Sequence, residues 1–239
     1  MAIEHATGTY YADSDGPTTT PGNFNATIPD DADCVILYVT GYLDNVNPPL
    51  TYGAAGCTLG DVAADYEITG ANDSNSTFQG AAWVWTGAHV TKGATHFDWS
   101  WVGTLTNAAK FVWVAYKGVA SIRSVFGQND AVIPQYSTGA LGNSAGDYIS
   151  VCAFGYSSGG NEATINSWTN AIEISEFVHN VYADLTLAEN TSASADTTIS
   201  TATTTSYEDG GIMAVVMVPA AGGLSITATE TLSFAEALD

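Results

Sequence analysis

The sequence predicts an all-β protein, a two-sheet antiparallel β-sandwich of the jelly-roll kind, and three observations lead to this prediction. Apolar runs of strand length recur along the chain, and turn-forming Gly, Asn, Asp and Ser residues separate them. No window of helical length shows an apolar residue at every third or fourth position. A series of about ten to thirteen short strands with such loops is typical of a sandwich.

The chain of 239 residues could form one large sandwich or two small domains, and we expect one domain because sandwiches of this length are common. Hydrophobic residues make up 46% of the chain, which is ample for a core. We expect residues 1–27 to form an N-terminal arm or edge segment, residues 28–234 a single β-sandwich domain, and residues 235–239 a tail. We find no internal repeat of fixed period, which argues against a propeller or solenoid.

The strands can be placed in order along the chain. Residues 1–27 are rich in Thr, Gly, Asp and Pro, and residues 28–33 break the chain before the apolar, β-branched run at residues 34–40. Residues 191–206 are rich in Ser, Thr and Ala, and we expect an exposed edge strand there because Thr favours strands. Further strands are predicted at residues 57–62, 78–86, 95–102, 110–117, 148–156, 171–178, 182–188, 197–205, 212–218 and 224–234.

Aromatic residues alternate with other residues along three of these strands, so that each set lies on one face of its sheet. Burying the aromatic rings would supply the core of a sandwich, at about 1.5 to 3 kcal/mol for each side chain. An exposed band would instead stack sugar rings, as in a glycan-binding module. We expect the core. The residues are Trp83 and Trp85, then Phe97, Trp99 and Trp101, and finally Phe111 and Trp113.

The charge of the chain restricts its partners. Only Lys92, Lys110, Lys117 and Arg123 are basic, against 25 acidic residues, which gives a formal net charge of −21. Binding to nucleic acid requires clustered Lys and Arg, so nucleic acid is excluded as a partner, and an anionic membrane surface is disfavoured for the same reason. Such an acidic surface suits a marine or saline environment, where salt screens the repulsion between carboxylates.

The N-terminal residues and the cysteines bear on where the protein is made. Residues 1–5 show neither the basic nor the apolar region of a signal peptide, and no later run is long enough to span a membrane. We therefore expect synthesis in the cytoplasm without Sec export. Cys34, Cys57 and Cys152 form no Cys-x-x-Cys pair, and we expect buried free thiols, with one disulfide and one free thiol as the alternative.

No metal or cofactor site is predicted. Asp13 and Asp15 resemble the start of a calcium loop, but Phe24 stands where its bidentate Glu would be. Loop carboxylates near Asp31 and at residues 72–74 could hold calcium adventitiously, and solvated turns are the simpler interpretation. The histidines lack zinc-motif spacing with one another or with cysteine. They are His5, His89, His96 and His179, and the other carboxylates of the first loop are Asp30 and Asp33.

No catalytic motif is present either. The chain lacks a nucleophile elbow, a metalloprotease helix motif and a phosphate-binding loop. Glu173 and Glu176 are close in sequence, as the two acids of a glycosidase can be, but in a regular strand they would face opposite sides. We therefore expect no enzymatic activity.

Residues 111–119, 146–153 and 209–218 together resemble the core strands of phage and prophage β-sandwich virion proteins. The resemblance implies a non-enzymatic virion structural protein, either an exterior decoration or cement protein of a phage capsid or a tail accessory. From the absence of a catalytic motif and the acidic surface, we also expect a homo-oligomer, with a trimer favoured, bound to a major capsid or tail protein. The segment before Pro29 and residues 191–206 are the expected contacts. The alternative is a glycan-binding β-sandwich module used in surface attachment.

Overall fold

The computed structural model describes residues 2–15, 22–43, 51–69, 78–102, 105–131, 135–156, 165–179, 183–203 and 209–221. Within these residues the chain consists of antiparallel strands and one short 3-10 helix, η1 (Gly87–His89), which confirms the all-β prediction. No helix among them is long and apolar enough to cross a membrane. The predicted strand at residues 224–234 and the tail at residues 235–239 lie outside the described residues.

The first half of the described chain, residues 2–117, forms two sheets. In the first inner sheet, β1 (Glu4–His5) and β2 (Tyr11–Asp15) both pair with β10 (Leu105–Lys117), and β4 (Cys34–Leu43), β8 (Phe78–Thr86) and β7 (Tyr66–Thr69) follow. The first outer sheet has the order β3 (Gly22–Ile28), β9 (Gly93–Val102), β5 (Thr51–Leu59) and β6 (Val62–Ala63).

The second half, residues 119–221, also forms two sheets. The second inner sheet has the order β11 (Val119–Ala131), β18 (Asp209–Pro219), β13 (Tyr148–Tyr156), β16 (Ala183–Asn190) and β15 (Ile172–His179). The second outer sheet has the order β12 (Ser137–Ala140), β17 (Thr198–Thr203) and β14 (Ile165–Thr169).

The two halves repeat one topology. The comparison leaves out β1 and the short β6 and numbers the remaining strands of each half from one to eight along the chain. In both halves the inner sheet then has the spatial order first, eighth, third, sixth and fifth, and the outer sheet has the order second, seventh and fourth. Apart from the fifth strand, which joins the inner sheet, this is the strand order of a jelly roll. The sequence predicts one sandwich of two sheets, whereas the described strands form four sheets, two in each half. Each half can form its own sandwich because about a hundred residues suffice for one.

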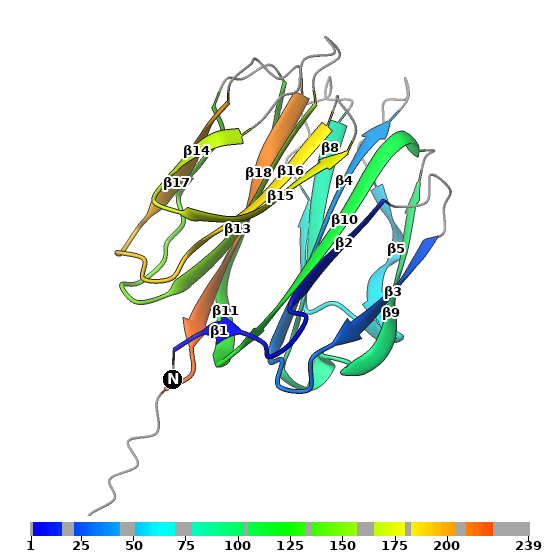
Figure 1. The fold of residues 1–239 in the computed structure, drawn as a ribbon, viewed down its shortest axis with the longest axis horizontal. Coiled ribbons are helices and arrows are strands. Elements are labelled where there is room, and N and C mark those ends of the chain that lie inside the picture. Colours follow the sequence, from blue (N-terminus) through cyan, green and yellow to red (C-terminus); the bar gives the residue numbers. More distant parts are fainter. Residues whose placement is uncertain are drawn as a thin grey trace, which may run out of the picture.

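The four sheets stack as layers, with the two inner sheets facing each other (Figure 1). Three apolar cores fill the spaces between them. The first outer core, between the sheets of the first half, contains Trp83, Trp113 and Phe97. The second outer core lies between the sheets of the second half and is built around Ile199 and Val216. The central core joins the two inner sheets.

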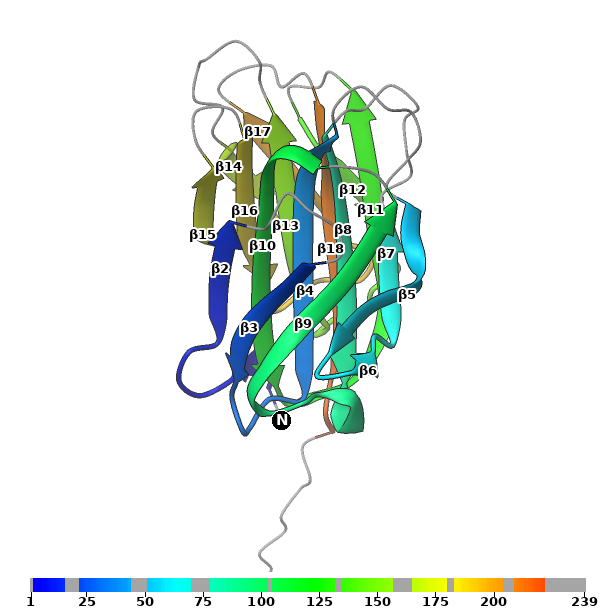
Figure 2. The same ribbon diagram turned by 90° about the vertical axis from the view of Figure 1, so that its right-hand side faces the viewer.

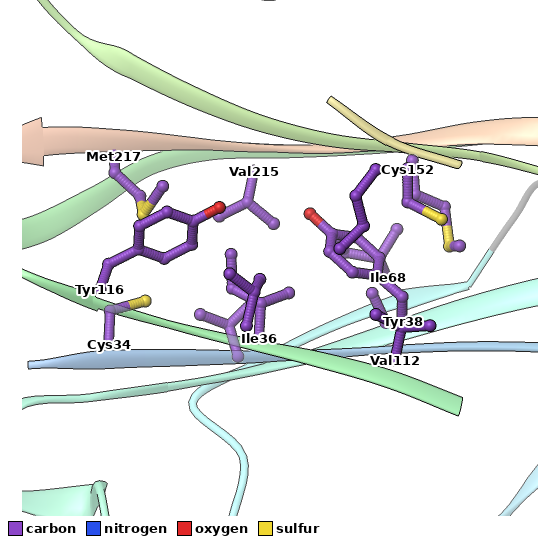
Figure 3. Close-up of a cluster of buried hydrophobic side chains, with 14 of the residues drawn as sticks. Cys34, Ile36, Tyr38, Ile68, Val112, Tyr116, Cys152, Val215 and Met217 are labelled. Carbon is purple, nitrogen blue, oxygen red and sulfur yellow. The ribbon is translucent and has the colours of Figure 1, made fainter. Parts of the chain in front are cut away.

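The central core contains side chains from both halves. Figure 3 shows Tyr38 and Tyr116 directed from the first inner sheet towards the second, where Cys152, Val215 and Met217 lie. Each of these five side chains is fully buried. The two jelly rolls therefore share one buried interface.

The two inner sheets face each other with their strand orders running in opposite directions, so the first strand of one half lies over the fifth strand of the other. β8 packs on β18 and β7 packs on β11. On the other side of the sheet, Tyr11 of β2 meets Phe177 of β15, with ring centroids 6.0 Å apart. Between them, Tyr38 of β4 bonds to Ser150 of β13. The third strand of each half thus lies over the third strand of the other, so an approximate twofold axis passes between β4 and β13.

A single residue, Gly118, joins the two halves. Its φ of +78° favours glycine, and a Cβ there would lie 2.5 Å from the carbonyl oxygen of Ala2. The Gly118 amide donates to Asp33 Oδ2 at 2.7 Å, and its carbonyl accepts from the amide of Ala220. The connection, the start of the chain and the end of β18 are therefore tied together at one end of the molecule (Figure 1).

The structure corrects one predicted edge strand and locates another segment. β17, within the Ser/Thr/Ala-rich residues 191–206, lies between β12 and β14 and is not an edge strand. Ile199 and Thr201 are buried there, and the Thr138 hydroxyl accepts a hydrogen bond from the Ile199 amide. Threonine side chains are therefore buried and hydrogen-bonded within this sheet. The described part of residues 1–27 supplies β1, β2 and most of β3, and β2 and β3 lie at sheet edges.

Candidate functional site

The predicted aromatic band is buried, as the core interpretation requires. Trp83, Trp85, Phe97, Phe111 and Trp113 are each at most 1% exposed and all belong to the first outer core. The side chains of Trp99 and Trp101 are outside the described residues. The described members of this band therefore offer no exposed platform on which a sugar ring could stack.

The cysteines are buried free thiols, as predicted. Cys34 and Cys152 lie in the central core, and Cys57 lies in the first outer core. Burial raises the pKa of Cys34 and of Cys57, with smaller contributions from nearby carboxylates. These thiols are therefore protonated and shielded at neutral pH, which makes them poor nucleophiles.

A buried polar network lies within the central core, around Glu189 of β16. The Glu189 carboxylate accepts hydrogen bonds from the hydroxyl of Tyr116, at 2.6 Å, and from that of Tyr148. His5 Nε2 lies 2.7 Å from the same carboxylate. Ser150 Oγ bonds to Tyr116 at 2.9 Å and to Tyr38 at 3.0 Å.

The network connects the two halves of the molecule. Tyr38 and Tyr116 come from the first inner sheet, whereas Tyr148, Ser150 and Glu189 come from the second. Burial raises the pKa of all three tyrosines, and the charge of Glu189 raises it further. The hydroxyls therefore stay protonated, and those of Tyr116 and Tyr148 donate to the carboxylate, which satisfies a buried charge. This cluster therefore joins the two halves.

A second cluster lies on the exterior of the first outer sheet. His96 and Asp98 are two residues apart on β9, so both side chains point away from the core, and His96 Nε2 lies 2.9 Å from Asp98 Oδ2. Asp61 is close to both. One ligand atom from each of the three residues lies within 4.8 Å of the others.

A tight turn positions Asp61. Gly60 and Asp61 connect β5 to β6 as a two-residue hairpin with Leu59 opposite Val62, and their φ values are +56° and +67°. Positive φ at both central residues is the pattern of a type I′ turn. The Gly60 amide donates to the carbonyl of His96 at 2.8 Å, which holds the turn against β9.

Two hollows adjoin β3, the edge strand beside β9, which faces the viewer in Figure 2. One, of about 400 Å³, is lined by His96 together with Asn25 and Thr27 of β3 and Thr95 of β9. The other, of about 380 Å³, lies on the side of β3 towards β2 and reaches Trp113. Ligand-type side chains and a recess therefore occur together on the exterior of the first outer sheet.

Two of the loop carboxylates that could have held calcium, those of Asp31 and Asp33, have structural partners. Asp31 accepts hydrogen bonds from the hydroxyl and the amide of Thr7, which lower its pKa, and Lys117 lies 3.5 Å away. Asp33 accepts from Gly118. Asp13 and Asp15 lie in β2, and residues 72–74 are outside the described residues.

Other ionisable pairs stabilise local structure. Asp65 accepts from the Thr86 amide at 2.7 Å and from His89 beside it. Arg123 donates to the buried carboxylate of Asp147 at 2.6 Å. These contacts involve different regions of the surface and form no basic patch in the described chain.

The structure changes the interpretation of the two glutamates of β15. A register shift between Glu173 and Ser175 interrupts the regular alternation of the strand. The charge of Glu176 adds to burial in raising the pKa of Glu173, so the two carboxylates influence each other. The expectation that they face opposite sides assumed a regular strand and does not hold across this bulge.

The sequence analysis predicted no site residues and missed the cluster of Asp61, His96 and Asp98. The alternation of His96 and Asp98 on a strand was visible in the sequence and is a two-ligand signal. Asp61 is 35 positions before His96 and becomes a neighbour only through the β5–β6 hairpin. No family model, curated protein or solved structure matches the chain.

Proposed function

We propose that this chain is a non-enzymatic structural protein of a phage particle, carried in many copies on the exterior as a capsid decoration or cement protein or as a tail accessory. The observation that supports this proposal is the shared central core. Two jelly rolls are fused face to face into one block, and the buried polar groups described between them bond to one another. Such a block suits a building unit.

The fold and the charge agree with this role. Jelly rolls recur in viral capsid proteins and in lectins, so the fold alone does not choose between the two. The burial of the described part of the aromatic band favours the capsid role over sugar stacking. With 25 acidic and four basic residues, the protein would be repelled by packaged DNA and suits an outward-facing position.

The proposed partners are further copies of the chain, with a trimer favoured, and a major capsid or tail protein. β2 and β3 present the free edges of the first inner and first outer sheets, and both face the same side of the molecule (Figure 2). Free strand edges readily pair with a neighbouring strand. We assign the contact to these edges, since β17 is central in its sheet.

Light scattering on the purified protein tests the assembly. We expect a small oligomer for the wild type and a monomer for the double variant Asn23→Lys/Thr27→Lys, which places charges on the exposed positions of β3. The matched control, Ser167→Lys/Thr169→Lys on the edge strand β14, should remain oligomeric. Antibody labelling of intact particles tests the location.

The second candidate is a glycan-binding module used in surface attachment. Its support is the pair of hollows beside β3, where Asn25 and Thr27 offer hydrogen-bonding groups. Screening the protein against a glycan array separates the two proposals. A wild-type monomer that labels no particle and binds a glycan would exclude the virion proposal and support the second.

A further inference from the structure

We propose that Asp61, His96 and Asp98 form a binding site for a divalent transition-metal cation, with Zn²⁺ as the best match, on the exterior of the first outer sheet. The inference concerns this surface cluster alone and does not depend on the virion role. It rests on the types of donor that the cluster contains, on their spacing and on how the backbone positions them.

The donor types select the class of cation. An imidazole nitrogen with two carboxylates is a set that Zn²⁺ and neighbouring transition metals accept, whereas Ca²⁺ and Mg²⁺ prefer oxygen ligands alone. Three protein ligands leave a coordination position for water. The ion would also offset the repulsion between the Asp61 and Asp98 carboxylates.

The spacing is close to what a metal requires. With metal–ligand bonds of about 2.0 to 2.1 Å, two ligand atoms on one ion are about 2.9 to 3.4 Å apart. His96 Nε2 and Asp98 Oδ2 are already 2.9 Å apart, which is within this range. Asp61 lies within 4.8 Å of both, and its side chain is exposed, so a small rotation can close the third contact.

The backbone around the cluster is well defined. β9 pairs with β3 on one side and with β5 on the other, and the Gly60 amide bonds to the His96 carbonyl. Asn25 stands directly opposite His96 in this register and lines the adjoining hollow. The site is therefore carried on paired strands and a two-residue turn, which limits the cost of ordering its ligands.

The other exposed histidine–aspartate pair offers a contrast within the same half. His89 contacts Asp65, but that carboxylate already accepts from both the amide and the hydroxyl of Thr86. Within the described residues, Asp61, His96 and Asp98 form the one group of three ligand-type side chains this close together, so His89 has one nearby carboxylate where His96 has two. A single shared carboxylate makes the Asp65 pair a weak ligand set.

The exposure of the site sets the expected strength of binding. The side chains of His96 and Asp98 are 40% and 42% exposed, so water competes for the ion and completes its coordination. The net charge of −21 raises the cation concentration near the surface. We expect one Zn²⁺ for each chain, bound with a Kd on the order of micromolar, well short of a buried structural zinc site.

Isothermal titration calorimetry with ZnCl₂, on the full chain in metal-free buffer of about 0.15 M NaCl, tests the proposal. The variants His96→Ala and Asp61→Asn should each weaken Zn²⁺ binding at least tenfold, while His89→Ala should leave it unchanged. Circular dichroism and thermal melting check that each variant is folded. In proton NMR spectra, Zn²⁺ should shift the His96 imidazole signals before those of His89.

Competing cations decide between a specific site and general attraction to an acidic protein. A tenfold excess of Ca²⁺ or Mg²⁺ over Zn²⁺ should not displace the ion, because the imidazole contributes nothing to their binding. Zn²⁺ binding that is absent up to millimolar concentration, that survives His96→Ala, or that Ca²⁺ matches in affinity would each overturn the proposal.

Discussion

The two halves of the molecule share a topology but fill their outer cores with different side chains. The first outer core is rich in aromatic residues and contains Trp83, Trp85 and Trp113, whereas the second outer core is built mainly from smaller aliphatic residues such as Val151 and Ile199. Both halves have the same strand order and, along their inner strands, the same alternation between residues that face the central core and residues that face an outer core. We infer that this alternation determines the topology and that the volume of the individual side chains does not.

The comparison extends to single strands. Asp33 precedes β4 and Asp147 precedes β13, and each carboxylate accepts a hydrogen bond from a backbone amide outside the strands, that of Gly118 for Asp33 and that of Ser144 for Asp147. After these aspartates, alternate residues face the central core in both strands, beginning with Cys34 and Tyr148. The halves differ in the group that binds the aspartate, since Asp147 also pairs with Arg123.

The largest expected effect tests whether the halves unfold together. Trp113→Ala removes a fully buried indole from the first outer core and should lower the free energy of unfolding by about 3 to 5 kcal/mol. Because the central core is common to both halves, we expect a single transition in urea that is detected at the same midpoint by tryptophan fluorescence and by far-UV circular dichroism.

The probes in this experiment report on different parts of the chain. Five of the six tryptophans lie in the first half, and only Trp168 lies in the second, so fluorescence follows mainly the first half. The control, Ile199→Ala in the second outer core, should shift the same transition. Two separate transitions in either variant would show that the jelly rolls are independent units.

The next effect concerns the polar network that joins the halves. Glu189→Ala leaves the buried hydroxyl of Tyr148 without its acceptor and that of Tyr116 with Ser150 alone, and should destabilise the protein by about 3 kcal/mol. The control is Glu173→Ala, an exposed glutamate of the same sheet, for which the change should stay within about 0.5 kcal/mol. Equal effects measured by urea denaturation would mean that the network does not stabilise the interface.

Alkaline pH should weaken the same interface. Burial raises the pKa of Tyr38, Tyr116 and Tyr148 above that of an unfolded tyrosine, near 10, so the folded state retains protons that the unfolded state releases. The stability that these buried tyrosines contribute is therefore fully present below about pH 10 and is lost as the pH rises above it. Cys34 and Cys57 contribute in the same direction from about pH 8.5.

The expected loss above pH 10 is about 1.4 kcal/mol per pH unit for each buried tyrosine. Urea denaturation between pH 8 and pH 11 measures this slope. Tyr148→Phe should reduce this slope by the contribution of one buried tyrosine. Tyr66→Phe, at an exposed position on β7, should leave the slope unchanged. A stability that does not change across this range would show that these hydroxyls ionise as readily in the folded protein as in the unfolded chain.

The sequence predicted the strands well and the arrangement of the sheets less well. The run at residues 34–40 and the alternating tryptophans showed directly which residues are buried, because period two reports on one sheet at a time. The repeat remained hidden because the halves share an apolar phase but few residue identities. β17 was misplaced because threonine content suggests an exposed surface, whereas Thr138 and Thr201 use their hydroxyls on backbone amides inside the second half.

The smallest expected effect compares two tryptophans of the first outer core. Trp85 Nε1 donates to the carbonyl of Val62 at 2.9 Å, and this bond links β8 of the inner sheet to β6 of the outer sheet. For Trp113, the described residues provide no acceptor to Nε1. Phenylalanine removes a similar ring volume at both positions, but only at Trp85 does it also remove a hydrogen bond. Trp85→Phe should therefore cost about 1 kcal/mol more than Trp113→Phe in urea denaturation. The double variant should show additive losses if the two sites are independent. A greater loss for Trp113→Phe would mean that packing, and not the hydrogen bond to β6, determines how strongly each indole stabilises the aromatic half.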